Sequence, residues 1–272
     1  MPLKPLIICI SPHQDDIALS TSLLLHELYT KNSKINCKLI SCFTRTNYAP
    51  YLQNKSIESI SRKRELEDKR YAKKLALDMI EVISIGMNDS PLREEWDRTC
   101  DIYRPDNYYK HDYDEMLRYV HELLKKLSNY QEKPELAILP LGLQHKDHII
   151  VSKTSAIRFK DVPILIYEDV PYRFDIDNED IKKRVKDIES STGKKLIFIK
   201  SRNKFNQDLW VNLLNCYKSQ FSKEEIENMA NKLNNKGGEN YWACSAAINL
   251  LESMNINLEL INKFGNQEEK VK

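Results

Sequence analysis

Short apolar runs alternate with longer amphipathic stretches over the first 170 residues of the chain. Residues 6–10, Leu-Ile-Ile-Cys-Ile, predict a buried strand, and residues 17–30 carry apolar side chains at the three- and four-residue spacing of a helix. Residues 36–42 predict a second strand. A strand, a helix and a strand in this order form a βαβ unit, so we expect the two strands to pair in parallel.

The same alternation continues to Tyr167 and then changes. Further elements are predicted as helices at 56–77, 113–127 and 148–159, and as strands at 81–85, 136–139 and 162–167. Residues 86–112 have weak periodicity, which predicts a long loop that could reach over a site. Beyond Asp175 we expect a charged segment, a short apolar run at 195–199 and helices near 206–220 and 222–232.

These elements predict an α/β fold with a Rossmann-like, mostly parallel sheet flanked by helices. We expect a single domain over residues 1–272, with a core of about 1–173 and a C-terminal helical and strand extension over about 174–272. The chain has only 6 glycines, and neither G-x-G-x-x-G nor a P-loop motif occurs. We therefore expect no nucleotide site.

Charge and cysteine content narrow the classes of function. Lys+Arg number 42 and Asp+Glu 40, and the net charge of +2 predicts no nucleic-acid or acidic-lipid partner. The six scattered cysteines contain no Cys-x-x-Cys pair, which is typical of a reduced cytosolic protein. The N-terminal apolar run is too short for a signal peptide, and no stretch approaches the ~18 apolar residues of a membrane span. These features predict a cytoplasmic protein without a membrane span.

Two polar clusters directly follow predicted buried strands. Pro12-His13-Gln14-Asp15-Asp16 comes after the first strand, and His145-Lys146-Asp147-His148 comes after residues 136–139. Because open α/β sheets bind ligands at the carboxyl ends of their strands, we expect both clusters to belong to one site. A divalent metal held by histidine and aspartate is the simplest chemistry that needs both residue types.

A metal-binding set can be drawn from the two clusters. A three-residue step separates His13 from Asp16, so both can face one point where a loop turns into a helix. Together with His148 they make a two-histidine, one-carboxylate set, which leaves an open position for water on Zn²⁺. Asp15 cannot share the direction of Asp16, and we predict that it acts as the general base.

The second cluster supplies two further candidates. His145 lies three residues before His148 and could stabilise a tetrahedral oxyanion or protonate a leaving amine. Asp147 could orient His145 or a metal-bound histidine by accepting a ring N–H. Taken alone, each residue is more simply a loop residue, and Asp15 or Asp16 a helix N-cap. The coincidence of both clusters favours the active-site interpretation.

Further segments extend the pattern of the two clusters. Ser11 precedes the first cluster, and four more motifs follow along the chain: Arg64-x-x-Glu67-Asp68, Asp89-x-x-x-Arg93, Tyr167-Glu168-Asp169-x-Pro171-Tyr172 and Tyr217-x-Ser219-Gln220. Together these motifs resemble those of the PIG-L/LmbE-like deacetylase family, in a bacterial branch that reads Ser-Pro-His-x-Asp-Asp. The chain departs from the family at Ser20-Thr21-Ser22, where members often have Gly-Gly, and at Ile17, where they often have Glu.

The resemblance implies a Rossmann-like sheet and a Zn²⁺-dependent enzyme that removes acetyl from an N-acetylated amino sugar or a related amine. By motif position it implies the metal ligands His13, Asp16 and His148, the base Asp15, the oxyanion or acid residue His145, and the substrate-binding residues Arg64 and Asp89. For Arg64 and Asp89, surface salt bridging is the alternative.

The sequence therefore predicts a metal-dependent N-deacetylase of an N-acetylglucosaminyl conjugate: a glycoside, a polysaccharide precursor or an aminoglycoside-type antibiotic intermediate. The expected metal is Zn²⁺, with Fe²⁺ or another divalent ion as the alternative, and a homo-oligomer stays open. Two other functions also stay open: a metallohydrolase of another amide or ester, and an inactive sugar-binding member of the same fold. Loop aromatics that could stack on a sugar or pack on the body are Tyr48, Trp96, Tyr103, Tyr108 and Tyr109.

Overall fold

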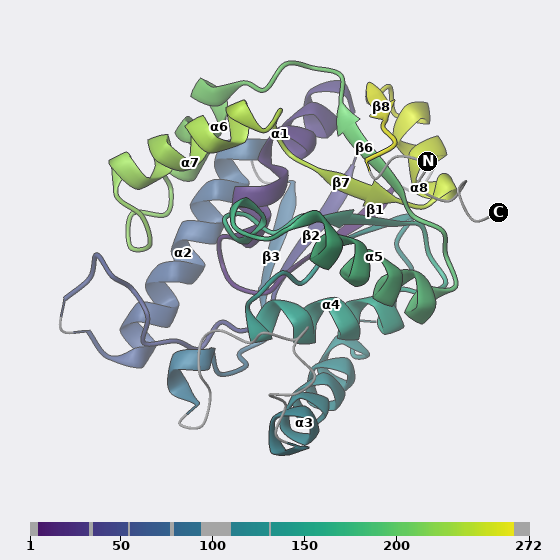
Figure 1. The fold of residues 1–272 in the computed structure, drawn as a ribbon. Helices are drawn as coiled ribbons and strands as arrows, with labels where there is room; N and C mark the ends of the chain where they lie inside the picture. Colours follow the sequence, from purple (N-terminus) through teal and green to yellow (C-terminus); the bar gives the residue numbers. More distant parts are fainter. Residues whose placement is uncertain are drawn as a thin grey trace.

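The computed structural model places the chain around one mixed sheet (Figure 1). It describes residues 5–32, 35–53, 55–76, 79–93, 110–130 and 132–263, and of residues 110–117 the backbone alone. Within these residues the eight strands lie side by side in the order β3 (Ile80–Ser84), β2 (Asn36–Ser41), β1 (Leu6–Ser11), β4 (Leu136–Pro140), β5 (Ile164–Tyr167), β7 (Tyr241–Ala243), β6 (Ile197–Ser201) and β8 (Leu258–Leu260).

The sheet has a parallel part and an antiparallel part. The first five strands in the order above, β3 to β5, pair in parallel. The last three, β7, β6 and β8, come from the C-terminal part of the chain and pair antiparallel. The predicted α/β fold with a mostly parallel, Rossmann-like sheet is thereby confirmed, and the C-terminal extension continues the same sheet.

The order of the strands reverses between β1 and β4. The chain adds β2 and β3 outward from one edge of β1, and it returns to place β4 on the other edge. The two strands pair in parallel with Cys9 opposite Ile138, so their carboxyl ends lie next to each other. Such a reversal is where open α/β sheets form their ligand crevice. Both polar clusters start from it.

Helices cover both faces of the sheet (Figure 1). One face carries α1 (Asp16–Lys31), α2 (Ile57–Ala76), α6 (Gln207–Leu214) and α7 (Lys223–Asn235), and the other carries α3 (Lys110–Leu127), α4 (Lys146–Arg158) and α5 (Asn178–Thr192). The short α8 (Ser245–Ser253) packs near β5. None of the described helices has the combined length and apolar character of a membrane span.

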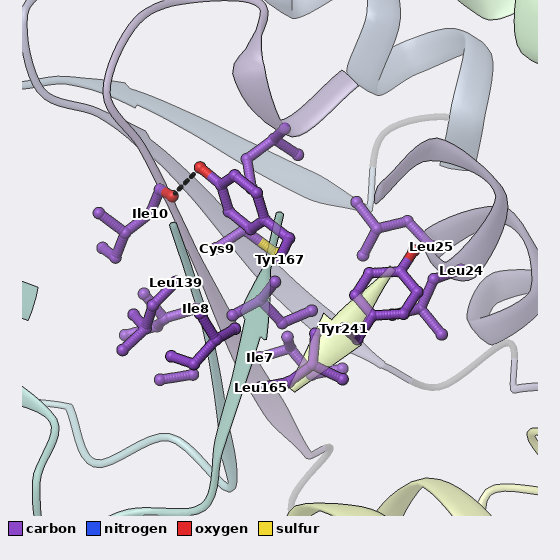
Figure 2. Close-up of a cluster of buried hydrophobic side chains, with 14 of the residues drawn as sticks. Ile7, Ile8, Cys9, Ile10, Leu24, Leu25, Leu139, Leu165, Tyr167 and Tyr241 are labelled. Atoms are coloured by element: carbon purple, nitrogen blue, oxygen red, sulfur yellow. Dashed lines mark hydrogen bonds between the residues drawn. The ribbon is translucent and has the colours of Figure 1, made fainter. Parts of the chain in front are cut away.

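Burial in the core explains why the central strands could be predicted from the sequence. Residues Ile7 to Ile10 of β1 are almost completely buried, because helices cover the sheet on both sides. Figure 2 shows them packed among Leu139, Leu165 and Tyr167. The Tyr167 hydroxyl reaches over β4 and donates to the carbonyl oxygen of Ile10 at 3.0 Å. A continuous apolar run is the pattern expected for a strand buried on both faces.

The C-terminal part differs most from the sequence prediction. The predicted charged segment contains a helix, α5, whose buried face consists of Ile181, Arg184, Val185 and Ile188. The arginine interrupts the apolar stripe, which is why periodicity did not reveal the helix. Helix α6 ends at Leu214, short of the predicted residue 220, and β7, α8 and β8 were not predicted. Three-residue strands are too short to show a period of two.

The predicted long loop over 86–112 is partly replaced by regular structure. A short 3₁₀ helix, η1, covers Ser90–Leu92, and α3 begins at Lys110, three residues before the predicted start. Residues 94–109 lie outside the described part of the chain. The other predicted elements of the first 170 residues agree with the structure to within a few positions.

Gly142 lies where the chain leaves β4 toward the second polar cluster. Its φ of +82° is in the left-handed region, and a Cβ there would lie 2.7 Å from both Arg184 Nη2 and Ser152 Cβ. The buried Arg184 donates to the carbonyl oxygens of Leu141 at 3.1 Å and Gly142 at 3.0 Å. The guanidinium therefore occupies the space that any side chain at position 142 would need.

We expect Gly142→Ala to lower the free energy of unfolding by roughly 2–4 kcal/mol, because it adds left-handed strain and overpacking. Gly193→Ala is the matched control. Gly193 has a φ of +67° and no atom within 4 Å of a built Cβ, so only the backbone strain of about 1–2 kcal/mol applies. Urea unfolding followed by circular dichroism measures both variants, and equal losses would contradict the steric role of Arg184.

Candidate active site

Three side chains of the two clusters converge between the ends of β1 and β4. Asp16 is the first residue of α1, and its Oδ2 lies 3.3 Å from His13 Nδ1. Its other oxygen, Oδ1, lies 3.4 Å from Nε2 of His148, which is in the first turn of α4. All three residues are buried, and their candidate ligand atoms lie within 4.8 Å of one another. The three predicted metal ligands are therefore brought together.

Local hydrogen bonds shape the loop that carries the first cluster. The backbone N–H of His13 donates to Asp16 Oδ2 at 2.7 Å. The Ser11 hydroxyl donates to the carbonyl oxygen of His13 at 2.5 Å and accepts from the N–H of Ile17 at 3.3 Å. These bonds turn the chain from β1 directly into α1. The turn places His13 and Asp16 at one point, as their spacing predicted.

In each imidazole, the outer nitrogen, which is the one that does not face Asp16, lies close to a second carboxylate. His148 Nδ1 lies 2.7 Å from Oδ1 of Asp169, and Oδ2 of Asp169 accepts from the backbone N–H of Gly142 at 2.8 Å. His13 Nε2 lies 3.2 Å from Asp147 Oδ2, the contact predicted for Asp147 with a metal-bound histidine. The sequence identified Asp169 only as a member of the motif at residues 167–172 and predicted no role for it. A carboxylate behind a histidine fixes the ring and makes its other nitrogen a better ligand.

The charges around the imidazoles shift their pKa values and that of Asp16. Burial lowers the pKa of His13, but the carboxylates of Asp89, Asp147 and Asp16 outweigh it, and the pKa is well above the usual value. Burial raises the pKa of Asp16, but His148 and His13 outweigh it and hold the pKa at about 2. Burial lowers the pKa of His148, but Asp16 and Asp169 outweigh it and raise the pKa. The cluster therefore favours positive charge at the two rings, whether as protons or as a metal ion.

Asp15 lines a cavity of about 340 Å³ beside this cluster. It holds the N-cap position of α1, but its side chain makes no capping hydrogen bond within the described structure. The N-cap alternative therefore does not account for its carboxylate. Burial raises the pKa of Asp15 to about 6, against the opposing charge of Arg64, whose Nη2 lies 3.4 Å from Asp15 Oδ1.

His145 lines the same cavity from the N-terminus of α4. Its Nδ1 accepts from the backbone N–H of Asp147 at 3.2 Å, and its Nε2 lies 3.4 Å from the Ser90 hydroxyl. Burial lowers the pKa of His145 to about 3, which keeps the ring neutral near neutral pH. A neutral ring that accepts at Nδ1 carries its proton on Nε2, the nitrogen near Ser90.

Arg64 and Asp89 also line the cavity, and they form a buried pair. They are only 3% and 4% exposed, so the surface salt-bridge alternative is wrong for both. Arg64 Nη1 lies 3.9 Å from Asp89 Oδ2, which also accepts from the Thr46 hydroxyl at 2.6 Å. Burial raises the pKa of Asp89, but His13 outweighs it, and the pKa lies below the usual value.

The cavity wall includes residues to which the sequence assigned no role. They are Leu19, Ser90, Pro91, Pro171, Tyr172, Gln220 and Phe221. Tyr172 and Gln220 belong to two of the motifs on which the family resemblance rests, but the sequence assigned these two residues no role. Of the five aromatics suggested for sugar stacking, Tyr48 lines the cavity, and the other four, Trp96, Tyr103, Tyr108 and Tyr109, lie outside the described residues.

Comparison with solved structures finds deacetylases with the same fold. A deacetylase of the teicoplanin biosynthesis pathway has a TM-score of 0.63 and 17% identity, covering 95% of this chain and 99% of that one. The zinc-inhibited form of teicoplanin deacetylase has a TM-score of 0.59 and 16% identity, covering 95% and 99%. The A40926 pseudoaglycone deacetylase has a TM-score of 0.57 and 14% identity, covering 89% and 97%. At these identities the likeness shows the fold alone.

Comparison with family models gives a closer assignment. Residues 8–158 match the PIG-L family, described as GlcNAc-PI de-N-acetylase, and a search of the curated proteins finds no match. The matched segment is more than half of the 272 residues and contains both polar clusters. The chain therefore belongs to the PIG-L family of de-N-acetylases.

Proposed function

We propose that the protein is a metal-dependent N-deacetylase that hydrolyses the acetamide of an N-acetylated amino-sugar conjugate. The observation that carries the proposal is the convergence of His13, Asp16 and His148, with their candidate ligand atoms within 4.8 Å of one another. Two imidazoles and one carboxylate leave coordination positions for water and substrate, as hydrolytic zinc sites do.

The residues fit a divalent metal ion. His148 Nε2 is buried and has no hydrogen-bond partner among the described residues, so its lone pair is available to a metal ion. Asp169 and Asp147 hold the outer nitrogens of the two rings. Zn²⁺ and Fe²⁺ both accept this combination of ligands. When bound, the ion supplies a Lewis acid that lowers the pKa of a water and polarises the acetyl carbonyl.

Asp15 is the proposed general base. Its carboxylate lines the cavity next to the metal-binding cluster, and Arg64 holds one of its oxygens at 3.4 Å. The second oxygen can accept a proton from the attacking water as the new carbon–oxygen bond forms. When the carbon–nitrogen bond breaks, the same proton returns to the leaving nitrogen. The products are the free amine and acetate.

His145 is the proposed donor to the oxyanion of the tetrahedral intermediate. Its Nδ1 already accepts from the backbone N–H of Asp147, so the ring proton is on Nε2, next to Ser90 of the cavity wall. A fixed N–H donor aimed at developing negative charge lowers the barrier without reorganising during the reaction. Of the two roles predicted for His145, this geometry favours the oxyanion role.

The proposed substrate is an N-acetylglucosaminyl conjugate. The family description names such a compound, and two of the similar structures are deacetylases of teicoplanin and of the A40926 pseudoaglycone. The cavity has a volume typical of small-molecule sites. We propose that Arg64 and Asp89 bind the sugar and that Tyr48 stacks on it or on the attached group. An antibiotic intermediate is one member of this substrate class.

Two alternatives make different predictions. An inactive sugar-binding protein should have lost a ligand or the base, but His13, Asp15, Asp16 and His148 are all present. A metallohydrolase of another amide or ester would keep the same four residues. It would hydrolyse simple amides or esters at least as fast as N-acetyl sugars, so a substrate panel separates it from the proposed deacetylase.

Acetate release from N-acetylglucosaminyl conjugates should depend on the metal. We expect removal of metal with a chelator to lower the rate at least about 100-fold, because water activation contributes on this scale, and Zn²⁺ to restore it. Enzymatic detection of acetate measures the rate, with N-acetylated alkyl amines as comparison substrates. A zinc-bound protein that releases no acetate from any N-acetyl sugar would contradict the substrate class.

Asp15→Asn should lower kcat by roughly 10²–10⁴-fold, because the amide cannot accept the proton of the attacking water. Zinc binding should be retained, because Asp15 is not among the proposed ligands. Asp161→Asn is the control, an exposed aspartate away from the cavity, and it should keep wild-type activity. Similar kcat values for Asp15→Asn and the wild type would remove Asp15 from the mechanism.

His145→Ala should lower kcat by roughly 10²–10³-fold, the usual cost of losing one oxyanion donor. His145→Gln tests the nature of the role, because glutamine offers an N–H donor but cannot transfer a proton to a leaving group. We expect glutamine to recover part of the lost activity. If both variants are equally inactive in steady-state assays, His145 acts as an acid and the oxyanion assignment is wrong.

A further inference from the structure

Asp147 forms an ion pair with Arg93, which the sequence identified only as a member of the motif Asp89-x-x-x-Arg93. Arg93 directly follows η1 and donates from Nη2 to Asp147 Oδ1 in a close ion pair. Its Nη1 donates to the carbonyl oxygen of Asn88 at 2.7 Å. Arg93 is 7% exposed and Asp147 is fully buried. A buried pair of this kind has a fixed geometry, because breaking it would leave an uncompensated buried charge.

Two aromatic rings hold the guanidinium of Arg93 in place. Its Cζ lies 4.9 Å from the ring centre of Phe43, just after β2, and 4.8 Å from that of Tyr119 in α3. The two rings also contact each other edge to face, with their centres 6.5 Å apart. Cation–π contacts favour this position of the cation. Arg93 therefore links α3 and the end of β2 to the active site.

The second oxygen of Asp147 faces the metal-binding cluster. Oδ2 lies 3.2 Å from His13 Nε2 and also accepts from the backbone N–H of Ser90 at 3.2 Å. Because Arg93 occupies Oδ1, the carboxylate cannot rotate without breaking the ion pair. The connection thus runs from Arg93 through Asp147 to His13, and its last member is a proposed metal ligand.

A second carboxylate competes for the same ring nitrogen. Asp89 Oδ1 also lies 3.2 Å from His13 Nε2, but this nitrogen has only one proton to donate. Asp89 lines the cavity and faces Arg64, whereas Asp147 does not line the cavity. Asp89 also has other donors: its Oδ1 accepts from the backbone N–H of Ser90 at 2.7 Å and its Oδ2 from the Thr46 hydroxyl at 2.6 Å.

We propose that Arg93 is a positioning residue of the metal site: it fixes Asp147 as the acceptor of the His13 ring N–H and thereby strengthens His13 as a ligand. The inference rests on the proposed metal-dependent function and deepens it, because it names the residue that sets metal affinity without touching the metal. Losing a hydrogen-bond partner behind a histidine ligand typically weakens metal binding about 10–100-fold.

The test is a double-mutant cycle on zinc affinity. The dissociation constant is measured on metal-stripped protein by competition with a chromophoric chelator, for the wild type, Arg93→Met, Asp147→Asn and the double variant. We expect Arg93→Met to bind zinc about 10–100-fold more weakly. The double variant should bind no more weakly than Asp147→Asn, because both changes weaken the same hydrogen bond to His13.

Arg158→Met is the matched control. Arg158 is half-buried, donates to the carbonyl oxygen of Tyr130 at 2.6 Å and lies over the ring of Phe159, but no contact connects it to a proposed ligand within the described residues. Its loss should leave the zinc dissociation constant unchanged. If Arg93→Met does not fold, as judged by thermal unfolding of the metal-free protein, Arg93→Lys replaces it in the same cycle.

Each outcome decides the proposal. Zinc affinity of the Arg93 variant within about twofold of the wild type, or an effect that adds fully to that of Asp147→Asn, overturns it. A wild-type protein that binds neither Zn²⁺ nor Fe²⁺ would instead overturn the proposed metal-dependent function. Weaker binding in Arg93→Met that disappears in the Asp147→Asn background, with Arg158→Met unchanged, supports the positioning role.

Discussion

The carboxylate of Asp16 between the imidazoles of His13 and His148 is the contact on which the rest of the site depends. His13 and Asp16 belong to the turn from β1 into α1, and His148 belongs to the first turn of α4 after β4. The three meet because β1 and β4 are neighbours where the strand order reverses. Without that pairing, one carboxylate could not lie within reach of both rings.

Buried charge is the second constraint on the site. Two of the aspartates around the two imidazoles have an arginine nearby: Asp15 has Arg64, and Asp147 has Arg93. An unpaired charge at this depth would cost several kcal/mol, so these pairs are conditions for folding as well as for chemistry. Burial of Asp15 and the imidazoles beside Asp16 also give these two adjacent aspartates different pKa values. The pKa of Asp15 is raised to about 6 and that of Asp16 is lowered to about 2, which suits the proposed proton acceptor and the proposed metal ligand.

The strands of the parallel sheet were predictable because a strand buried on both faces needs several consecutive apolar residues. Residues 6–10 and 136–139 are continuous apolar runs, which are typical of strands covered on both faces. The helix α5 was missed because a buried arginine, Arg184, takes a position that an apolar residue usually holds. Its hydrogen bonds go to carbonyl oxygens more than forty residues away in the sequence, at Leu141 and Gly142. Such partners leave no periodic signal.

The sequence by itself determined the kinds of candidate metal ligand and their local spacing. Histidine and aspartate three residues apart after a buried strand place both side chains at one turn, because strand ends and helix starts have few geometries. Only the tertiary structure decided which carboxylate faces each ring. His13 and Asp147 are 134 positions apart, and Arg93 and Asp147 are 54 apart. Hydrogen bonds act over about 3 Å and depend on direction, so these pairings exist only once the sheet and its helices are assembled.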